Sequence, residues 1–169
     1  LDALHLNKGE DIVLLSLSTT LATNACVEKN FCRCGLILFG STDKDLKEYG
    51  RLVGLNTAPD TFFAQGSIDI NGSIYEEPDW PEFKRRVKQW QKEFDCFAIV
   101  SKWGMKNNIL EITAKKILLD LCDKPIVCGY ELSSELNYFR RAVSAFLNAQ
   151  LTPIFANFMD SVKQSLERR

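Results

Sequence analysis

Residues 11–40 read DIVLLSLSTTLATNACVEKNFCRCGLILFG, and this stretch decides the fold. An apolar run at 11–17 leads through a cluster of hydroxyl side chains into a helix-prone segment that ends near Glu28, and a second apolar run follows at 31–39. This order predicts a strand, a helix and a strand. Ser18 or Thr19 can cap the helix, and the free N–H groups of a helix start also attract anions.

Composition restricts the class of protein. The chain has 169 residues, of which 46% are hydrophobic and 25% charged, and its formal net charge is −1. These values indicate one globular domain and give no electrostatic reason to expect nucleic acid or an acidic membrane as a partner. No apolar run approaches the roughly 20 residues that span a bilayer. The first residues lack the basic-then-apolar order of a signal peptide, so we expect a cytoplasmic protein.

Strand and helix patterns alternate along the rest of the chain. Asn71-Gly72 between two short alternating segments predicts a hairpin over 67–75. Two further helices are expected near the end, one capped by Ser133 or Ser134 and running through Asn148, and one that begins at Pro153. The other expected elements are helices at 44–53, 80–93 and 108–122, the last with Ile109, Ile112, Ile117 and Leu121 inward, and strands at 61–64, 96–100 and 125–128, followed by a turn at Gly129. The pattern predicts a layered α/β domain with a mixed, largely parallel sheet and flanking helices.

The chain contains six cysteines, which raises the question of disulfides or a metal. Several lie inside predicted strands or helices beside apolar residues, where free cysteine behaves as a small hydrophobic residue. Cys32 and Cys34 form a C-x-C pair, but no second CxxC half accompanies it and His5 is far away in the sequence. We therefore expect reduced core cysteines and no metal site.

Two segments resemble a known family. Residues 18–28, STTLATNACVE, resemble the GTTxATNAxxE signature of the N-terminal domain of the hydantoinase/oxoprolinase family. The family also has a helix of the form E-Y-x-R-x-x-T-x-x-x-N-A, to which Arg141, Ser144 and Asn148-Ala149 correspond. The resemblance covers essentially the whole chain. The sequence departs from the family pattern at three positions, which indicates a divergent subgroup with a different substrate: Ser18 replaces glycine, Phe139 replaces tyrosine and Ala142 replaces threonine.

The resemblance implies an activity and a larger fold. Members are ATP-dependent enzymes that open cyclic amides of the hydantoin or 5-oxoproline type, and they include a subunit of acetone carboxylase. The implied fold is actin-like, related to ribonuclease H, and ATP phosphorylates an amide oxygen before the ring is hydrolysed. The family's glycine-rich phosphate hairpin is absent here, since the sequence has no Gly-Gly pair. Residues 1–169 are thus expected to form one incomplete domain, inactive alone, whose parent protein binds ATP and Mg²⁺ and holds the catalytic residues mostly outside this chain.

The same resemblance suggests four substrate-binding residues: Thr19, Thr20, Asn24 and Arg141. Thr20 and Asn24 are four residues apart, on one face of the expected helix, where a hydroxyl and an amide can grip one ligand group. The alternative is that both bond only to neighbouring backbone. Arg141 can bind a substrate carboxylate or form a structural ion pair with Glu135 or Glu131, and the structural pair is the commoner arrangement.

The expected partners are a cyclic amide, the rest of the parent chain and a second hydantoinase subunit. Apolar surface left uncovered by missing parts also predicts self-association into a homo-oligomer. A non-catalytic domain that binds a ligand or a subunit of a complex is the main alternative function. A free-standing redox or metal protein built on the cysteines is the third.

Overall fold

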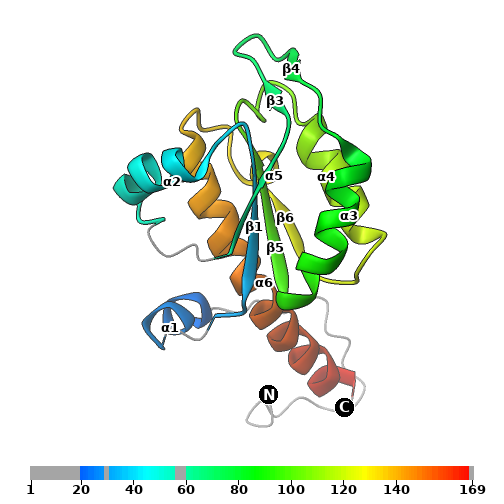
Figure 1. Cartoon of the computed structure of the whole chain (residues 1–169). Helices are drawn as coiled ribbons and strands as arrows, with labels where there is room; N and C mark the ends of the chain where they lie inside the picture. The colour runs from blue at the N-terminus through cyan, green and yellow to red at the C-terminus, as the bar shows by residue number, and fades with distance from the viewer. Residues whose placement is uncertain (1–19, 29–30, 56–59, 168–169) are drawn as a thin grey trace.

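Four parallel strands form the central sheet of the protein (Figure 1). The computed structural model describes residues 20–28, 31–55 and 60–167. The strands are β1 (Cys34–Phe39), β2 (Thr61–Ala64), β5 (Cys96–Ser101) and β6 (Ile126–Cys128), arranged in the order β2-β1-β5-β6. Every pairing in this sheet is parallel, so the predicted α/β class with a largely parallel sheet and flanking helices is confirmed.

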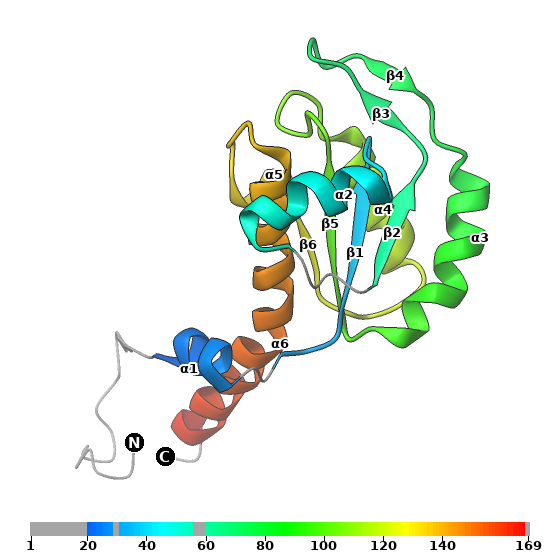
Figure 2. The ribbon, with the colours of Figure 1, turned by 60° about the vertical axis from the view of Figure 1, so that its left-hand side comes forward.

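Helices cover both faces of this sheet (Figure 2). α2 (Asp43–Tyr49), a 3₁₀ turn (Gly50–Val53) and α6 (Tyr138–Glu167) lie on one face. α3 (Trp80–Trp90), which a 3₁₀ turn (Gln91–Glu93) follows, and α4 (Ile109–Leu119) lie on the other. Side chains of a strand alternate between faces, and β1 and β5 are therefore buried at every position.

The predicted hairpin is confirmed as a separate antiparallel pair, β3 (Ser67–Ile68) and β4 (Ile74–Glu76). Gly72 has a φ of +91°, which the turn requires and which glycine adopts without strain. The Asp69 side chain accepts hydrogen bonds from the backbone N–H groups of Asn71 and Ser73, at 2.8 and 2.9 Å. The hairpin projects beyond the carboxyl ends of the parallel strands (Figure 1).

The end of the chain differs from the prediction. A short helix α5 (Gly129–Leu132) begins where a turn was expected, and α6 then runs without interruption to Glu167 with Pro153 inside it. The cap of α6 is Asn137, whose Oδ1 accepts the Arg140 N–H at 3.1 Å, so the prediction of a Ser133 or Ser134 cap was wrong. Two helices were predicted because proline usually marks a boundary, but it removes only one helical hydrogen bond.

The inward face of α4 also differs from the prediction. Its buried residues are Leu110, Glu111, Ala114 and Leu118, whereas Ile109 is exposed and Ile112, Ile117 and Leu121 are only partly buried. The expected face was therefore rotated by about one residue, because it was placed on the three isoleucines and Leu121 and not on Leu110, Ala114 and Leu118. The correct face carries a glutamate.

Several predictions concern residues outside the described ranges. The strand at 11–17 and the helix cap at Ser18 or Thr19 lie there, whereas the helix predicted to end near Glu28 is confirmed as α1 (Leu21–Glu28). Cys32, Cys34, Cys96, Cys122 and Cys128 are free, and Cys34, Cys96 and Cys128 are buried as expected. In the same part of the chain, none of the helices combines the length and apolar character needed to cross a bilayer.

Candidate functional site

Thr20 and Asn24 lie at the start and in the middle of α1. The Asn24 backbone N–H donates to the Thr20 carbonyl at 2.8 Å, which places the two residues one helical turn apart. Both residues are exposed. Neither side chain makes a hydrogen bond to another described residue. Thr19 lies outside the described residues.

The structure does not bring Arg141 near this helix. α1 contacts α6 beyond the amino ends of the parallel strands, whereas Arg141 lies in the first turn of α6, at the carboxyl ends (Figure 2). Thr20 and Asn24 therefore belong to one surface and Arg141 to another. One ligand of the size of a small ring does not contact all of them.

Arg141 is 1% exposed, and its guanidinium binds backbone carbonyls. Nη2 donates to the Ser101 carbonyl at 2.9 Å, and Nη1 donates to the carbonyls of Glu135 and Leu136. The carboxylate of Glu135 pairs with Arg140 at 3.2 Å. The carboxylate of Glu131 pairs with Lys115 at 2.7 Å, so the predicted ion pair of Arg141 with Glu135 or Glu131 was wrong. Substrate binding by Arg141 stays a prediction.

Glu111 is a buried acidic residue that the sequence reasoning missed. Its side chain is fully buried; Oε1 accepts the Ser101 N–H at 2.8 Å and the Ser101 hydroxyl at 3.0 Å, and Oε2 accepts the Tyr130 N–H at 3.1 Å. Burial raises the pKa of Glu111, while these hydrogen bonds and the charge of Arg141 oppose the rise. A glutamate on the apolar face of α4, in register with Ala114 and Leu118, was the signal that could have identified it.

A pocket of about 220 Å³ opens at the carboxyl ends of β5 and β6. In the sheet, β2 lies on one side of β1, and the later strands β5 and β6 lie on its other side. The direction in which strands are added therefore reverses between β1 and β5. Ligands of open parallel sheets bind at the carboxyl edge near such a switch point. The pocket is lined by Gly104, Met105, Lys106, Asn108, Tyr130, Ser133 and Ser134.

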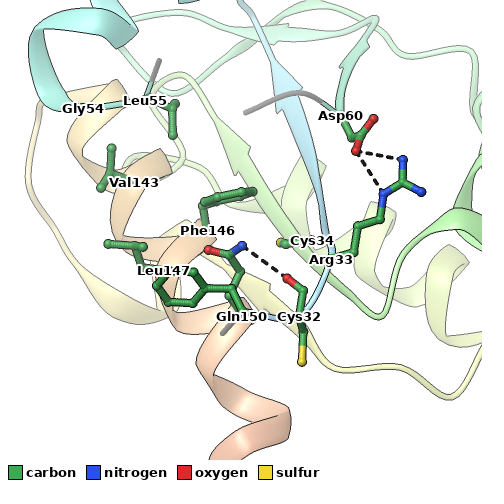
Figure 3. A pocket seen from close by; sticks show the side chains of 11 residues that line it. Cys32, Arg33, Cys34, Gly54, Leu55, Asp60, Val143, Phe146, Leu147 and Gln150 are labelled. Carbon is green, nitrogen blue, oxygen red and sulfur yellow. Dashed lines mark hydrogen bonds and ion pairs between the residues drawn. The ribbon is translucent and has the colours of Figure 1, made fainter. Parts of the chain in front are cut away.

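A second pocket, of about 430 Å³, lies at the amino end of β1 beside α6 (Figure 3). Arg33 binds Asp60 through Nε and Nη2, at 3.2 and 3.1 Å, and Gln150 Nε2 donates to the Cys32 carbonyl at 3.2 Å. Burial, with smaller effects from Cys96 and Asp95, raises the pKa of the Cys32 thiol and makes it a poor nucleophile. The lining residues are Phe31, Cys32, Arg33, Cys34, Gly54, Leu55, Asp60, Val143, Phe146, Leu147 and Gln150.

Side chains that could bind a metal are dispersed over the described residues. No cluster of three His, Cys, Asp or Glu side chains in the described ranges is placed to hold a metal ion. The carboxylates at the carboxyl edge, Glu111 and Glu131, already accept hydrogen bonds from protein groups. Binding of ATP with Mg²⁺ by the parent protein stays a prediction.

Comparisons with known proteins agree on one fold. The chain is 20% identical to an ATP-dependent caprolactamase from Pseudomonas jessenii, with a TM-score of 0.72 over 88% of this chain and 24% of that chain. It is 14% identical to a nucleotide-free acetone carboxylase, with a TM-score of 0.73 over 89% of this chain and 25% of that chain. Both likenesses concern the fold, and the chain spans about a quarter of each structure.

Sequence comparison gives the family. An uncharacterized protein of Methanocaldococcus jannaschii is 25% identical over 114 residues, which are 65% of this chain and 16% of that protein. The model of the hydantoinase/oxoprolinase N-terminal region matches residues 2–122, which include α1 with Thr20 and Asn24 and the sheet as far as β5. The chain belongs to the hydantoinase/oxoprolinase N-terminal family.

Proposed function

We propose that this chain is part of an ATP-dependent enzyme that opens cyclic amide rings of the hydantoin or 5-oxoproline type. The observation that carries the proposal is α1, where the family signature presents Thr20 and Asn24 on one exposed face without hydrogen bonds to other described residues. A hydroxyl and an amide one turn apart can bind the carbonyl and N–H of a ring amide together. Their proposed role is to hold the substrate.

The caprolactamase supports the ring-opening class, since its name states an ATP-dependent reaction on a lactam and its fold is similar. The proposal includes the route that the family resemblance implies, through a phosphorylated amide. No step of that route is assigned to the described residues, since none of them is grouped in threes around a possible metal ion. Nucleotide, metal and catalytic groups are proposed to come from parts of the parent protein beyond this chain, and the chain alone is proposed to be inactive.

A second candidate is a non-catalytic domain that binds a ligand or a subunit. The acetone carboxylase favours it, because a similar fold occurs there in an enzyme whose name states a different reaction. Under either function the partners are the rest of the parent chain and a second subunit. Exposed apolar side chains such as Val27 on α1 and Met159 on α6, 76% and 54% exposed, are the surfaces for such contacts or for self-association.

The test measures ADP release by the complete parent protein with 5-oxoproline, hydantoins and larger lactams. Thr20→Ala and Asn24→Ala are compared with Gln164→Ala, which removes an exposed amide from α6. We expect ring-stimulated ADP release that falls at least about tenfold in the two α1 variants, since each removes a hydrogen bond to a bound group. The control is expected to retain full stimulation.

Two results would contradict the proposal in different ways. Stimulation that persists in both α1 variants would remove α1 from the substrate site but leave the enzyme class. An absence of stimulation by every ring, with the parent protein folded, would favour the binding-domain alternative.

A further inference from the structure

The last residue of β5, Ser101, is held from both faces of the sheet. From α4, Glu111 accepts its N–H at 2.8 Å and its hydroxyl at 3.0 Å. From α6, on the opposite face, Arg141 donates to its carbonyl at 2.9 Å. We call Glu111, Ser101 and Arg141 the Ser101 clamp.

Stability alone does not explain this clamp. Glu111 and Arg141 are 0% and 1% exposed, and burying two charges costs free energy that apolar side chains of similar volume avoid. The two charges form no direct ion pair in the described structure: Arg141 donates to backbone carbonyls, and Glu111 accepts two backbone N–H groups and the Ser101 hydroxyl. Arg141 Nε, also buried, has no hydrogen-bond partner among the described residues. The charges therefore fix the backbone at the cost of an incomplete set of hydrogen bonds.

The backbone that they fix is a strained turn. Trp103 has a φ of +62°, the only positive φ of a non-glycine residue in the described part of the chain, and this conformation is unfavourable for a bulky side chain. Gly104 follows and packs against the clamp so closely that a Cβ there would overlap Glu111 Oε1. Strain of this kind persists only where surrounding contacts hold it, and it is concentrated at functional sites.

The turn lies where the switch point of the sheet, the smaller pocket and the hairpin come together. It lies at the switch point between β1 and β5, and it leads directly into Lys106, which lines the 220 Å³ pocket. Asn107 Nδ2 donates to the Gly72 carbonyl at 2.9 Å and so ties the β3–β4 hairpin to the same segment. A shift of this segment therefore moves one wall of the pocket and also the hydrogen bond to the hairpin turn at Gly72.

We propose that Glu111 and Arg141 are positioning residues for the parent enzyme, and that the segment Ser101–Lys106 which they fix contacts the cyclic amide. This inference rests on the proposed function for its substrate. It assigns Arg141 a role through the turn. It also makes the carboxyl edge the alternative to α1 as the surface that contacts the ring, because one small ring does not reach both ends of the strands. Lys106 is exposed beside the pocket and is the residue of the segment proposed to touch the ligand.

The first experiment uses this chain and asks whether the clamp fixes the turn. In Glu111→Gln the amide NH₂ must face either the Ser101 or the Tyr130 N–H, because both carboxylate oxygens now accept from N–H donors. The readout is amide hydrogen exchange of Gly104 and Lys106, which bond to the carbonyls of Ser101 and Trp103 at 3.1 and 2.8 Å. The matched control is Glu82→Gln, which breaks an exposed pair with Arg85.

We expect exchange at Gly104 and Lys106 to become at least about tenfold faster in Glu111→Gln, with the amides of β1 and the early part of β5 unchanged. A merely structural role would accelerate exchange throughout the chain by a similar factor. Uniform acceleration, or no change at the turn, would overturn the positioning role. Where Glu111→Gln does not fold, Arg141→Lys takes its place, since lysine cannot bind the three carbonyls as the planar guanidinium does.

The second experiment uses the complete parent protein and separates the two parts of the proposal. Lys106→Ala is expected to raise the KM for the lactam at least about tenfold. Glu111→Gln is expected to lower kcat/KM at least about tenfold, with both variants assayed at a temperature well below their Tm. Wild-type kinetics in Lys106→Ala would overturn contact between this segment and the substrate. A wild-type parent without ring-stimulated ADP release would overturn the proposed function and the substrate assignment, whereas the exchange result on this chain would still decide whether the clamp fixes the turn.

Discussion

Pro153 lies inside α6, and its replacement by alanine tests whether the helix is continuous. Proline has no N–H to donate to the carbonyl of Ala149, four residues earlier, and its ring crowds that carbonyl. In a helix interior this costs about 3 kcal/mol relative to alanine. Pro153→Ala restores the hydrogen bond and relieves the contact, so it is expected to raise the free energy of unfolding.

Two effects reduce the gain. Proline limits the conformations of the unfolded chain, and removing it costs about 0.4–1 kcal/mol of stability. The half-buried ring also loses part of its packing. The net increase is then about 2 kcal/mol, which for a chain of this length corresponds to a rise in Tm of about 4–8 °C. Urea unfolding followed by far-ultraviolet circular dichroism and calorimetry both measure it.

The control is Asn157→Ala, an exposed position on the same helix where only helix propensity changes, by a few tenths of a kcal/mol up to about 0.7. A gain for Pro153→Ala that does not exceed the control would show that the residues beyond 153 are not part of the cooperative helix. A loss of stability would show that the proline ring packs in a way the continuous helix does not explain.

Three further predictions follow from the core and the helix caps. In Gly35→Ala the new Cβ would lie 2.6 Å from the Trp90 ring, so overpacking is expected to lower the free energy of unfolding by about 1–3 kcal/mol in urea titrations; an unchanged midpoint would contradict the packing at β1. Thr42→Ala removes the hydroxyl that accepts the Asp45 N–H in the α2 capping box, whereas the Thr42 N–H still donates to the Asp45 carboxylate; the change is expected to cost about 1 kcal/mol in the same titration, which an equally stable variant would disprove. A hydrogen bond with Cys96 and burial raise the pKa of Cys34, and burial raises the pKa of Cys128. Above about pH 9 an unfolded thiol loses its proton while these buried thiols keep theirs, so the free energy of unfolding should fall by about 1.4 kcal/mol per pH unit for each thiol. Unfolding free energies that do not change above this pH would refute the prediction.

Local patterns predicted the sheet and hairpin well. Apolar runs such as the one ending at Phe39 mark strands buried on both faces, and Asn71-Gly72 has few alternatives to a tight turn. The length of α6 could not be predicted in this way. Packing of Ala142, Ala145 and Ala149 against the sheet stabilises the helix before Pro153, and this contact between distant segments outweighs the local cost of proline.

The candidate site was predictable only in part. The signature identified α1 and the exposed side chains of Thr20 and Asn24. The Ser101 clamp was not visible, because Glu111 and Arg141 bind backbone groups, and backbone groups leave no mark in a sequence. Arg141 was expected to pair with a nearby carboxylate for the same reason: only side chains can be matched from sequence alone.

Because α6 comes last in the chain, it affects how this domain folds during synthesis on the ribosome. One face of β1 and β5, including Leu36 and Leu38, is covered mainly by the first turns of α6, which begins at Tyr138. All four parallel strands leave the exit tunnel before this helix does. A growing chain therefore carries a half-covered apolar sheet for about 1–4 seconds at ordinary elongation rates of about 5–20 residues per second. During that interval we expect the uncovered face to be open to chaperones, and the arrival of α6 to close it.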